Sequence, residues 1–243
     1  MITAAGRLHD VTSEERTFEA HGGGGFKAFV ALPAKLPAPA LVLLQEVYGV
    51  NRFMRRITEH WAAQGFLAVC PDVYWRLQPC IVLDPETPGH RERALEIGKR
   101  LDTDLAVHDL AALVEQLRAA RECTGKVATS GYCLGGKLAY LVGTRGNADC
   151  NVSYYGVGIE AYLGEAAGLR RPLLMHIGEA DPWTPEPVRA QLDAVLGGNP
   201  LVAVHLYPET GHAFAREGAA TDVPTMRALA NGRTLAFLRT HAG

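Results

Sequence analysis

The sequence predicts a doubly wound α/β fold, with a mostly parallel sheet, helices on both of its faces and an antiparallel hairpin at its N-terminal side. Two observations support this prediction. Short, continuous apolar runs alternate along the chain with longer stretches of helical periodicity, a pattern typical of parallel strands that are buried on both faces. A glycine run near the N-terminus separates two segments of alternating apolar residues. No stretch resembles an interdomain linker, so we expect a single domain over residues 1–243.

The hairpin is predicted over residues 17–33, where apolar positions alternate on either side of four glycines. His21 and the three glycines after it resemble the HGGG oxyanion motif of some esterases. That motif follows a central strand, whereas this one precedes the first such strand. We therefore interpret it as the turn of the hairpin.

The remaining elements follow in chain order. Strands are predicted at 39–46, 66–74, 127–133, 150–156, 172–179 and 202–208, and helices at 52–65, 135–146, 185–197 and 225–242. Residues 91–120 form a long amphipathic stretch that fits either one broken helix or two consecutive helices. The Pro-rich segment 33–40 is short enough to be a surface loop.

Composition excludes several classes of protein. Apolar residues make up 48% and charged residues 21% of the chain, which indicates a globular protein rather than a disordered or fibrous one. The net charge of −2 comes without a basic stripe, so we expect no nucleic-acid partner. No apolar run is long enough for a membrane span and no signal pattern opens the chain, so we expect a cytoplasmic location and no membrane contact. The five cysteines, an odd number without C-x-x-C spacing, favour neither a disulfide framework nor a metal site.

One cysteine lies in a motif of chemical interest. Residues 130–136 read S-G-Y-C-L-G-G between a predicted buried strand and a predicted helix, which is the pattern of a nucleophile elbow with Cys133 in the nucleophile position. The tight turn requires small residues at Gly131 and Gly135, and Gly136 lets the helix start close to the sheet. Backbone N–H groups at the helix start can stabilise negative charge, and the N–H of Leu134 is the first half of a predicted oxyanion hole.

An elbow nucleophile needs a base and an acid, which follow it along the chain in this fold. His212 and Asp181 are the candidates, because each lies in a loop after a predicted strand, where α/β sheets place catalytic groups. His176 and His205 fall inside apolar strands and are interpreted as core histidines. Glu179 is the close rival for the acid; Asp181 is preferred because the following proline favours an extended or turn conformation that can aim the side chain at His212.

These residues resemble a known family. The blocks at 45–51 (QEVYGVN), 70–76 (CPDVYWR), 131–136 (GYCLGG), 178–185 (GEADPWTP) and 211–216 (GHAFAR) are similar to those of the dienelactone hydrolases, also called carboxymethylenebutenolidases, within the α/β-hydrolase superfamily. The resemblance spans most of the chain in the right order. A cysteine in the elbow together with the Q-E-x-x-G-x-N block makes it specific.

The resemblance implies further roles. Glu46 corresponds to a glutamate that pairs with the resting nucleophile and takes part in its activation, and the N–H of Val47 completes the oxyanion hole. A solvated loop carboxylate is the alternative for Glu46. Arg76 and Arg216 match two arginines that hold a substrate carboxylate, a task that suits the planar guanidinium. The implied reaction opens dienelactone to maleylacetate in (chloro)aromatic catabolism, without metal or organic cofactor.

Other interpretations stay open at this point. The loop after Arg76 departs from the family pattern at Cys80, Ile81 and Val82, which leaves the substrate preference open. The alternatives are a broader ester, thioester or lactone hydrolase, and a non-enzymatic ligand-binding or redox-sensing protein that uses Cys133 without turnover. Tyr48, Tyr132 and Trp183 are candidates for the pocket lining, with aromatic packing as the alternative. The sequence leaves the oligomeric state and the dienelactone isomer open.

Overall fold

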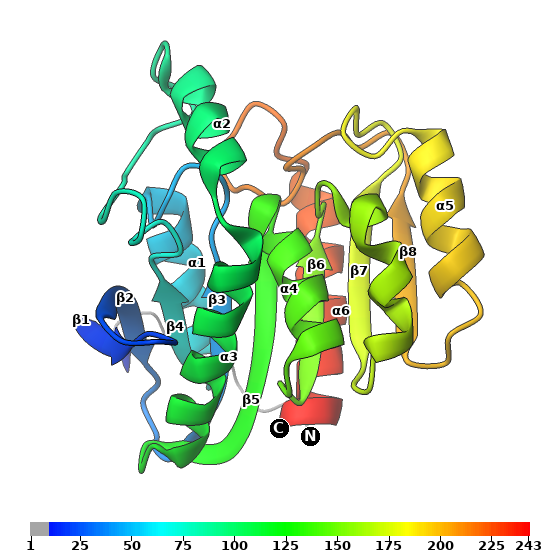
Figure 1. Ribbon diagram of the computed structural model, residues 1–243. Helices are drawn as coiled ribbons and strands as arrows, with labels where there is room; N and C mark the ends of the chain where they lie inside the picture. Colours follow the sequence, from blue (N-terminus) through cyan, green and yellow to red (C-terminus); the bar gives the residue numbers. More distant parts are fainter. Residues whose placement is uncertain (1–9) are drawn as a thin grey trace. The chain divides into compact units, whose positions relative to one another are not determined.

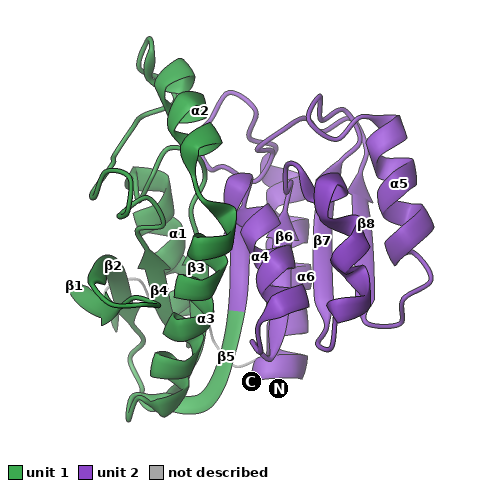
Figure 2. Cartoon of the chain, viewed as in Figure 1, with its two compact units in different colours: residues 1–128 green, residues 129–243 purple. Residues whose placement is uncertain are grey.

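The computed structural model describes residues 10–243, coloured along the chain in Figure 1. These residues form two compact units, one up to residue 128 and the other from residue 129 (Figure 2). The boundary falls inside strand β5 (Cys123–Tyr132). The prediction of a single domain stays a prediction, and each unit is described by itself.

The sheet of the first unit begins with the predicted hairpin. Strand β1 (Thr12–Glu19) pairs antiparallel with β2 (Gly25–Leu32), with Glu19 opposite Gly25 at the turn. Strand β2 pairs antiparallel with β4 (Leu67–Pro71), which pairs parallel with β3 (Ala38–Leu44). Gly22, Gly23 and Gly24 have positive φ angles in the connection. The interpretation of the HGGG segment as a hairpin turn is therefore confirmed.

Helices cover these strands on both faces, with α1 (Arg52–Ala63) and α3 (Thr103–Ala119) on opposite sides (Figure 1). Helix α1 starts where the side chain of Asn51 accepts a hydrogen bond from Met54 N, and it buries an apolar stripe against the sheet. The stretch 91–120 forms two helices, α2 (His90–Arg100) and α3. The break falls at Asp102, because its carboxylate caps the first turn of α3 through Leu105 N.

The second unit contains the end of β5 followed in order by β6 (Cys150–Tyr154), β7 (Leu173–Gly178) and β8 (Val202–Tyr207), with β6, β7 and β8 paired in parallel. Helix α4 (Leu134–Arg145) lies in front of these strands and α6 (Pro224–Ala242) behind them (Figure 1). Helix α5 (Glu186–Leu196) precedes β8. The α/β class and the antiparallel start are confirmed.

Two features of the second unit differ from expectation. Strand β8 is the edge strand at the end of the strand order, and its Val204 and Leu206 side chains are exposed. The expectation that the strands are covered on both faces is therefore wrong for β8. A 3-10 helix, η2 (Ile159–Gly168), follows β6 where no element was predicted, because its mixed apolar and small residues carry no clear period.

Within residues 10–243, no helix is long and apolar enough to cross a membrane. All five cysteines are free thiols.

Candidate active site

The elbow at Cys133 has the geometry that its sequence predicts. Cys133 lies between the last residue of β5 and the first of α4, with φ 55° and ψ −114°. A residue other than glycine is strained at positive φ, and such strain persists only where surrounding structure holds it. Two hydrogen bonds do so: Cys133 N donates to Tyr154 O at 3.0 Å, and Gly136 N donates to Cys133 O at 3.0 Å. Strand β6 and helix α4 therefore fix the backbone of the elbow.

Two glycines make this turn possible. A Cβ atom added at Gly131 would lie 1.9 Å from Gly135 O, and one at Gly136 would lie 2.7 Å from Gly156 Cα. Both obstacles are backbone atoms, which cannot move aside as a flexible side chain can. The predicted need for a small residue at Gly131 and the predicted close approach at Gly136 are therefore confirmed, and the need for a small residue at Gly135 stays a prediction.

We expect Gly131→Ala to lower the free energy of unfolding by more than about 4 kcal/mol, because the new methyl group and the Gly135 carbonyl cannot occupy the same space. Urea denaturation measures this loss. The control is Gly232→Ala inside α6, where a Cβ meets nothing within 4 Å, so the same change should raise the stability by up to about 1 kcal/mol. Equal effects of the two substitutions would contradict the geometry of the elbow.

His212 and Asp181 meet in the second unit. Asp181 follows β7 and His212 follows β8, and His212 Nδ1 lies 2.8 Å from Asp181 Oδ2. The other carboxylate oxygen of Asp181 accepts Trp183 N–H at 2.8 Å. Asp181 is 1% exposed. Both oxygens of this buried carboxylate are therefore bonded, one to His212 and the other to Trp183 N–H. The structure brings together the two residues that the sequence proposed as base and acid.

Cys133 completes this group from the elbow. Burial by itself would lower the pKa of His212, but hydrogen bonds with Asp181 and Cys133, and the charges of the same two groups, raise it to about 10. His212 therefore carries its proton at neutral pH. The sulfur of Cys133 thus has a positively charged imidazole beside it, and the residue keeps 9% of its surface exposed.

The alternatives for base and acid lie elsewhere. Glu179 is exposed, and its backbone N–H donates to Tyr207 O. His176 is fully buried, with its ring nitrogens 2.8 Å from the Tyr207 hydroxyl and 2.9 Å from the Thr234 hydroxyl. Burial lowers its pKa well below the ordinary value, which keeps it neutral. The interpretation of His176 as a core histidine is therefore confirmed, whereas His205 is only partly buried on β8.

Two more predicted residues belong to the same unit. Leu134 is the first residue of α4, whose N-terminus has no side-chain cap from Cys133, so the first turn presents its N–H groups at the elbow. Arg216 lies in the turn that follows His212, where its backbone N–H donates to Ala213 O at 2.9 Å. The oxyanion role of Leu134 and the binding role of Arg216 stay predictions.

The sequence did not single out Tyr155, which touches the histidine. Its ring meets the His212 ring edge-on at 5.1 Å between centroids, and its backbone has φ 39°. Trp183, 41% exposed, meets the same ring at 6.4 Å, whereas Tyr132 is fully buried and stacked on Tyr154. Tyr155 directly follows Tyr154, the last residue of β6. Its position at a strand end was the signal in the sequence that could have indicated a residue of the site.

Comparison with known proteins agrees with this geometry. The model of the dienelactone hydrolase family matches residues 26–242. The chain belongs to this family. It is 42% identical over 226 residues to the carboxymethylenebutenolidase of Pseudomonas putida, which covers 93% of this chain and 96% of the relative. It is 39% identical to carboxymethylenebutenolidase 1 of Cupriavidus pinatubonensis, with 89% and 92% covered.

Solved structures share the fold. The crystal structure of dienelactone hydrolase from Anabaena variabilis superposes with a TM-score of 0.69 at 16% identity, covering 97% of this chain and 100% of that one. A dienelactone hydrolase-like promiscuous phosphotriesterase from metagenomic libraries gives a TM-score of 0.77 at 18% identity, with 96% and 99% covered. With the curated relatives, these similarities make the chain a carboxymethylenebutenolidase-like hydrolase with the α/β-hydrolase fold.

Three residues that the dienelactone hydrolase resemblance implied lie in the first unit, namely Glu46, Val47 and Arg76. Glu46 follows β3 and is fully buried, so the alternative of a solvated loop carboxylate is wrong. Val47 is the next residue, and its carbonyl accepts the Tyr74 hydroxyl at 3.2 Å. Tyr48, a candidate pocket residue, is buried. The roles of Glu46 and Val47 at the nucleophile stay predictions.

Arg76 is held by a carboxylate of its own chain. Its Nε and Nη2 atoms each lie 2.9 Å from an oxygen of Asp109 on α3, and Nη2 also donates to His21 O at 2.7 Å. Asp109 further accepts Trp75 Nε1–H and His21 N–H, each at 2.9 Å. Three of the five N–H groups of Arg76 are thus committed, which leaves Nη1 for other partners. Substrate binding by Arg76 stays a prediction. While Asp109 is bonded to Nε and Nη2, Arg76 cannot use that pair of nitrogens for a bidentate contact with a substrate carboxylate.

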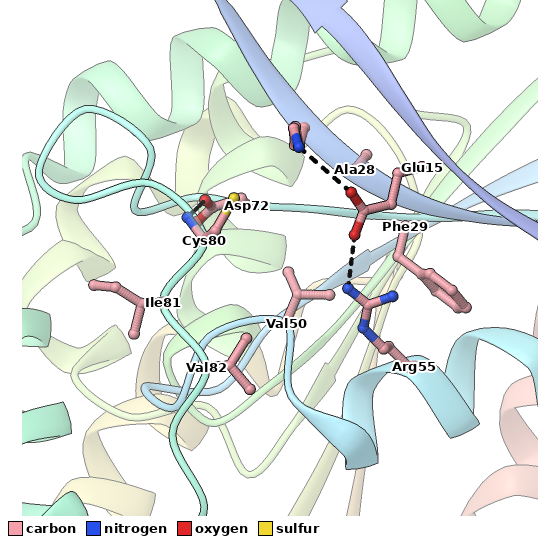
Figure 3. Close-up of a pocket in the computed structure, with 10 residues that line it drawn as sticks. Glu15, Ala28, Phe29, Val50, Arg55, Asp72, Cys80, Ile81 and Val82 are labelled. Carbon is pink, nitrogen blue, oxygen red and sulfur yellow. Dashed lines mark hydrogen bonds and ion pairs between the residues drawn. The ribbon is translucent and has the colours of Figure 1, made fainter.

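The loop that follows Arg76 lines a hollow in the first unit (Figure 3). Cys80, Ile81 and Val82 form one side of it and face residues of β1, β2 and the start of α1. Asp72 fastens the loop, because it accepts Tyr74 N–H at 3.0 Å and Cys80 N–H at 2.6 Å. Within residues 10–243, no group of three or more His, Cys, Asp or Glu side chains could hold a metal ion.

Proposed function

We propose that the protein opens the lactone ring of dienelactone, 4-carboxymethylenebut-2-en-4-olide, to give maleylacetate, with Cys133 as nucleophile and His212 as acid and base. The observation that carries the proposal is the bonding of His212 to Asp181 on one side and to Cys133 on the other. That arrangement is the one a nucleophile, a base and an orienting acid require. The names of the curated relatives supply the substrate class.

In the first half of the reaction the thiolate of Cys133 attacks the ring carbonyl carbon. The N–H group of Leu134, and that of Val47 as the family resemblance implies, are expected to stabilise the negative charge of the oxyanion that forms. The intermediate collapses with cleavage of the ring C–O bond, so that the acyl group remains on sulfur as a thioester. The ring oxygen leaves as an enolate, which takes up the proton that His212 carries.

The same geometry explains how His212 becomes a base in the second half. Cys133 is one of the two groups that raise the pKa of His212. Once the sulfur is acylated it carries no charge, so the pKa of His212 falls and its freed nitrogen can take a proton from water. The hydroxide attacks the thioester carbonyl, the thiolate leaves, and the enol product tautomerises to maleylacetate. Glu46 is expected to pair with the resting thiol and to take part in its activation.

A broader ester, thioester or lactone hydrolase is the second candidate. The expected departure of Cys80, Ile81 and Val82 from the family pattern favours it, since these residues lie in a loop that follows a predicted substrate-binding arginine. In that function Arg216 and Arg76 would serve other small acids. The non-enzymatic alternative uses Cys133 as a redox sensor. A cytoplasmic location is expected for all three, and no cofactor is expected for any of them.

Turnover of cis- and trans-dienelactone beside p-nitrophenyl acetate tests the proposal. We expect kcat/KM on at least one dienelactone isomer to exceed that on the neutral ester by tenfold or more, a preference on the order of one well-made charged contact. Negligible dienelactone turnover with good ester turnover would favour the broader hydrolase. Absence of hydrolysis of any ester would favour the sensor.

Arginine variants sharpen this test. We expect Arg216→Met to raise KM for dienelactone about ten- to a hundredfold with little change on p-nitrophenyl acetate, because only the anionic substrate needs the guanidinium. Arg76→Met should raise it less, since Asp109 and the His21 carbonyl already accept three of the five Arg76 N–H groups. Equal losses on both substrates would contradict a carboxylate-binding role for Arg216.

A further inference from the structure

The segment from Tyr154 to Val157, at the end of β6, contacts the elbow at three points. Cys133 N donates to Tyr154 O at 3.0 Å, and Val157 N donates to Cys133 O at 3.4 Å. A Cβ atom added at Gly156 would lie 3.0 Å from the carbonyl carbon of Gly136, so the two backbones pack directly against each other. This segment therefore fixes the backbone of the proposed nucleophile.

Tyr155 lies in this segment with a strained backbone. Its φ of 39° is outside the range that bulky residues ordinarily adopt. Its N–H donates to His176 O at 2.8 Å, and its side chain is fully buried. Strain of this kind persists only where the surrounding structure holds the residue, and it is concentrated at functional sites. The conformation of Tyr155 is therefore imposed by its neighbours.

The ring of Tyr155 packs against the loop that carries His212. The centroids of the Tyr155 and His212 rings are 5.1 Å apart, with 69° between the ring planes. The same tyrosine ring meets Phe214, two residues after His212, at 5.8 Å and 71°. Both contacts have the edge-to-face arrangement that aromatic pairs prefer. Tyr155 thus links the segment that bonds the elbow to the loop of the histidine.

A single hydrogen bond does not fix the plane of an imidazole. The bond between His212 Nδ1 and Asp181 holds one ring nitrogen, but the ring can still rock about that bond, because the χ2 angle of histidine has broad minima. Trp183 lies farther from the His212 ring, at 6.4 Å, and is 41% exposed. Tyr155 is closer and buried, so it restricts the imidazole more than Trp183 does.

We propose that Tyr155 is a positioning residue that fixes the plane of the His212 imidazole relative to the Cys133 sulfur. One short segment then sets the position of both groups, since its backbone bonds the elbow and its ring packs on the imidazole. In the proposed reaction His212 gives a proton to the leaving enolate and later takes one from water, and a misplacement of about 1 Å can cost about a hundredfold in rate. This inference rests on the proposal that Cys133 and His212 are the nucleophile and the base.

Two substitutions of Tyr155 separate the ring from the bulk of the side chain. Tyr155→Phe keeps the ring, whereas Tyr155→Leu keeps apolar bulk without it. We expect Tyr155→Leu to lower kcat for p-nitrophenyl acetate about ten- to a hundredfold, with KM changed by less than about threefold. The kcat of Tyr155→Phe should stay within about threefold of wild type, because the contact with the imidazole remains.

A titration of His212, followed by the NMR signals of its imidazole, is the second readout. The signals are identified by their absence from His212→Asn. In wild type, burial lowers the pKa of His212, but the bonds with Asp181 and Cys133 raise it to about 10. A ring that rocks makes weaker bonds, so this pKa should fall towards its ordinary value in Tyr155→Leu and stay raised in Tyr155→Phe.

Tyr140→Leu is the matched control for the loss of a buried tyrosine. Tyr140 is fully buried on α4, the helix that begins at the elbow, and its hydroxyl donates to Tyr162 O at 3.2 Å. We expect this variant to lower the unfolding temperature as Tyr155→Leu does. Its kcat and its His212 titration should stay close to those of wild type.

Wild-type kcat and an unchanged His212 titration in Tyr155→Leu would overturn the proposal. A lower kcat with an unchanged titration would also overturn it, since that result indicates a structural role, and equal losses in Tyr155→Leu and Tyr155→Phe would indicate the hydroxyl instead of the ring. Tyr155→Met is the second variant without a ring if Tyr155→Leu does not fold. The titration needs no turnover, so absence of hydrolysis by wild type would remove the proposed function and leave this test of the His212 ring intact.

Discussion

Replacement of Cys133 by alanine is expected to lower kcat/KM for every ester and lactone substrate by roughly 10⁴-fold or more, because no thioester can form without the sulfur. The fold should survive. The alanine keeps the Cβ that the elbow already accommodates and removes a single sulfur atom from a residue that is 9% exposed. Steady-state kinetics and a thermal unfolding curve, measured on the same preparation, check both parts.

Cys123→Ala is the matched control for this variant. Cys123 begins strand β5 and Cys133 directly follows its end, so the control removes a second buried thiol flanking the same strand, away from the elbow. Its sulfur donates to Lys126 O at 3.4 Å. We expect near-wild-type activity. Full hydrolysis by Cys133→Ala would instead exclude the covalent mechanism, in both its lactonase and its broader form.

Asp181→Asn is expected to lower kcat about 10²- to 10⁴-fold with a smaller change in KM. The amide keeps the shape of the carboxylate but loses the charge that holds His212 protonated and oriented. Trp183 N–H can still bond to the amide oxygen, so the loop should keep its conformation. The kinetic loss therefore reports the contact with the histidine.

The pH dependence of this variant has a definite sign. The pKa of His212 is raised to about 10 in the folded protein, and Asp181 is one of the groups that raise it. Activity that needs the imidazolium should decline in wild type as the pH rises towards about 10, and at lower pH in Asp181→Asn. Protonated His212 also stabilises the fold below its unfolded pKa of about 6.5, and that contribution is lost as the pH rises through about 10.

Glu179→Gln is the control for the acid. Glu179 lies two residues before Asp181 and was its rival in the sequence, but it is exposed. We expect wild-type kinetics and an unshifted pH profile for this variant. A large loss in Glu179→Gln, with little change in Asp181→Asn, would reverse the assignment of the acid.

Local sequence predicted the features whose causes are local. The hairpin depends on glycines that adopt positive φ angles between two alternating segments, and both signals lie within one short stretch. The elbow is similar, because the clash that excludes a side chain at Gly131 is with Gly135, four residues away. The cap of α3 is also local, because Asp102 bonds to Leu105, three residues later. The sequence nevertheless left open whether this stretch was one helix or two.

Contacts between distant residues were predicted only where chain order and family resemblance restricted the choice. Asp181 and His212 are 31 residues apart, and only the fold brings the loops after β7 and β8 together. Asp109 and Arg76 are 33 residues apart, and nothing in either segment announced their ion pair. The exposure of Val204 and Leu206 also depends on the position of β8 at the end of the strand order, which its apolar sequence does not encode.

The sequence by itself therefore determined the fold class, the strained position of Cys133 and the choice of His212 and Asp181 as its partners. Each of these depends on short motifs and on the order of those motifs along the chain. Only the tertiary structure decided the charges that surround those groups. The raised pKa of His212 and the pairing of the Arg76 guanidinium with Asp109 both depend on distances through space. Electrostatic interactions depend on distance and burial rather than on sequence separation, so the tertiary structure is needed to determine them.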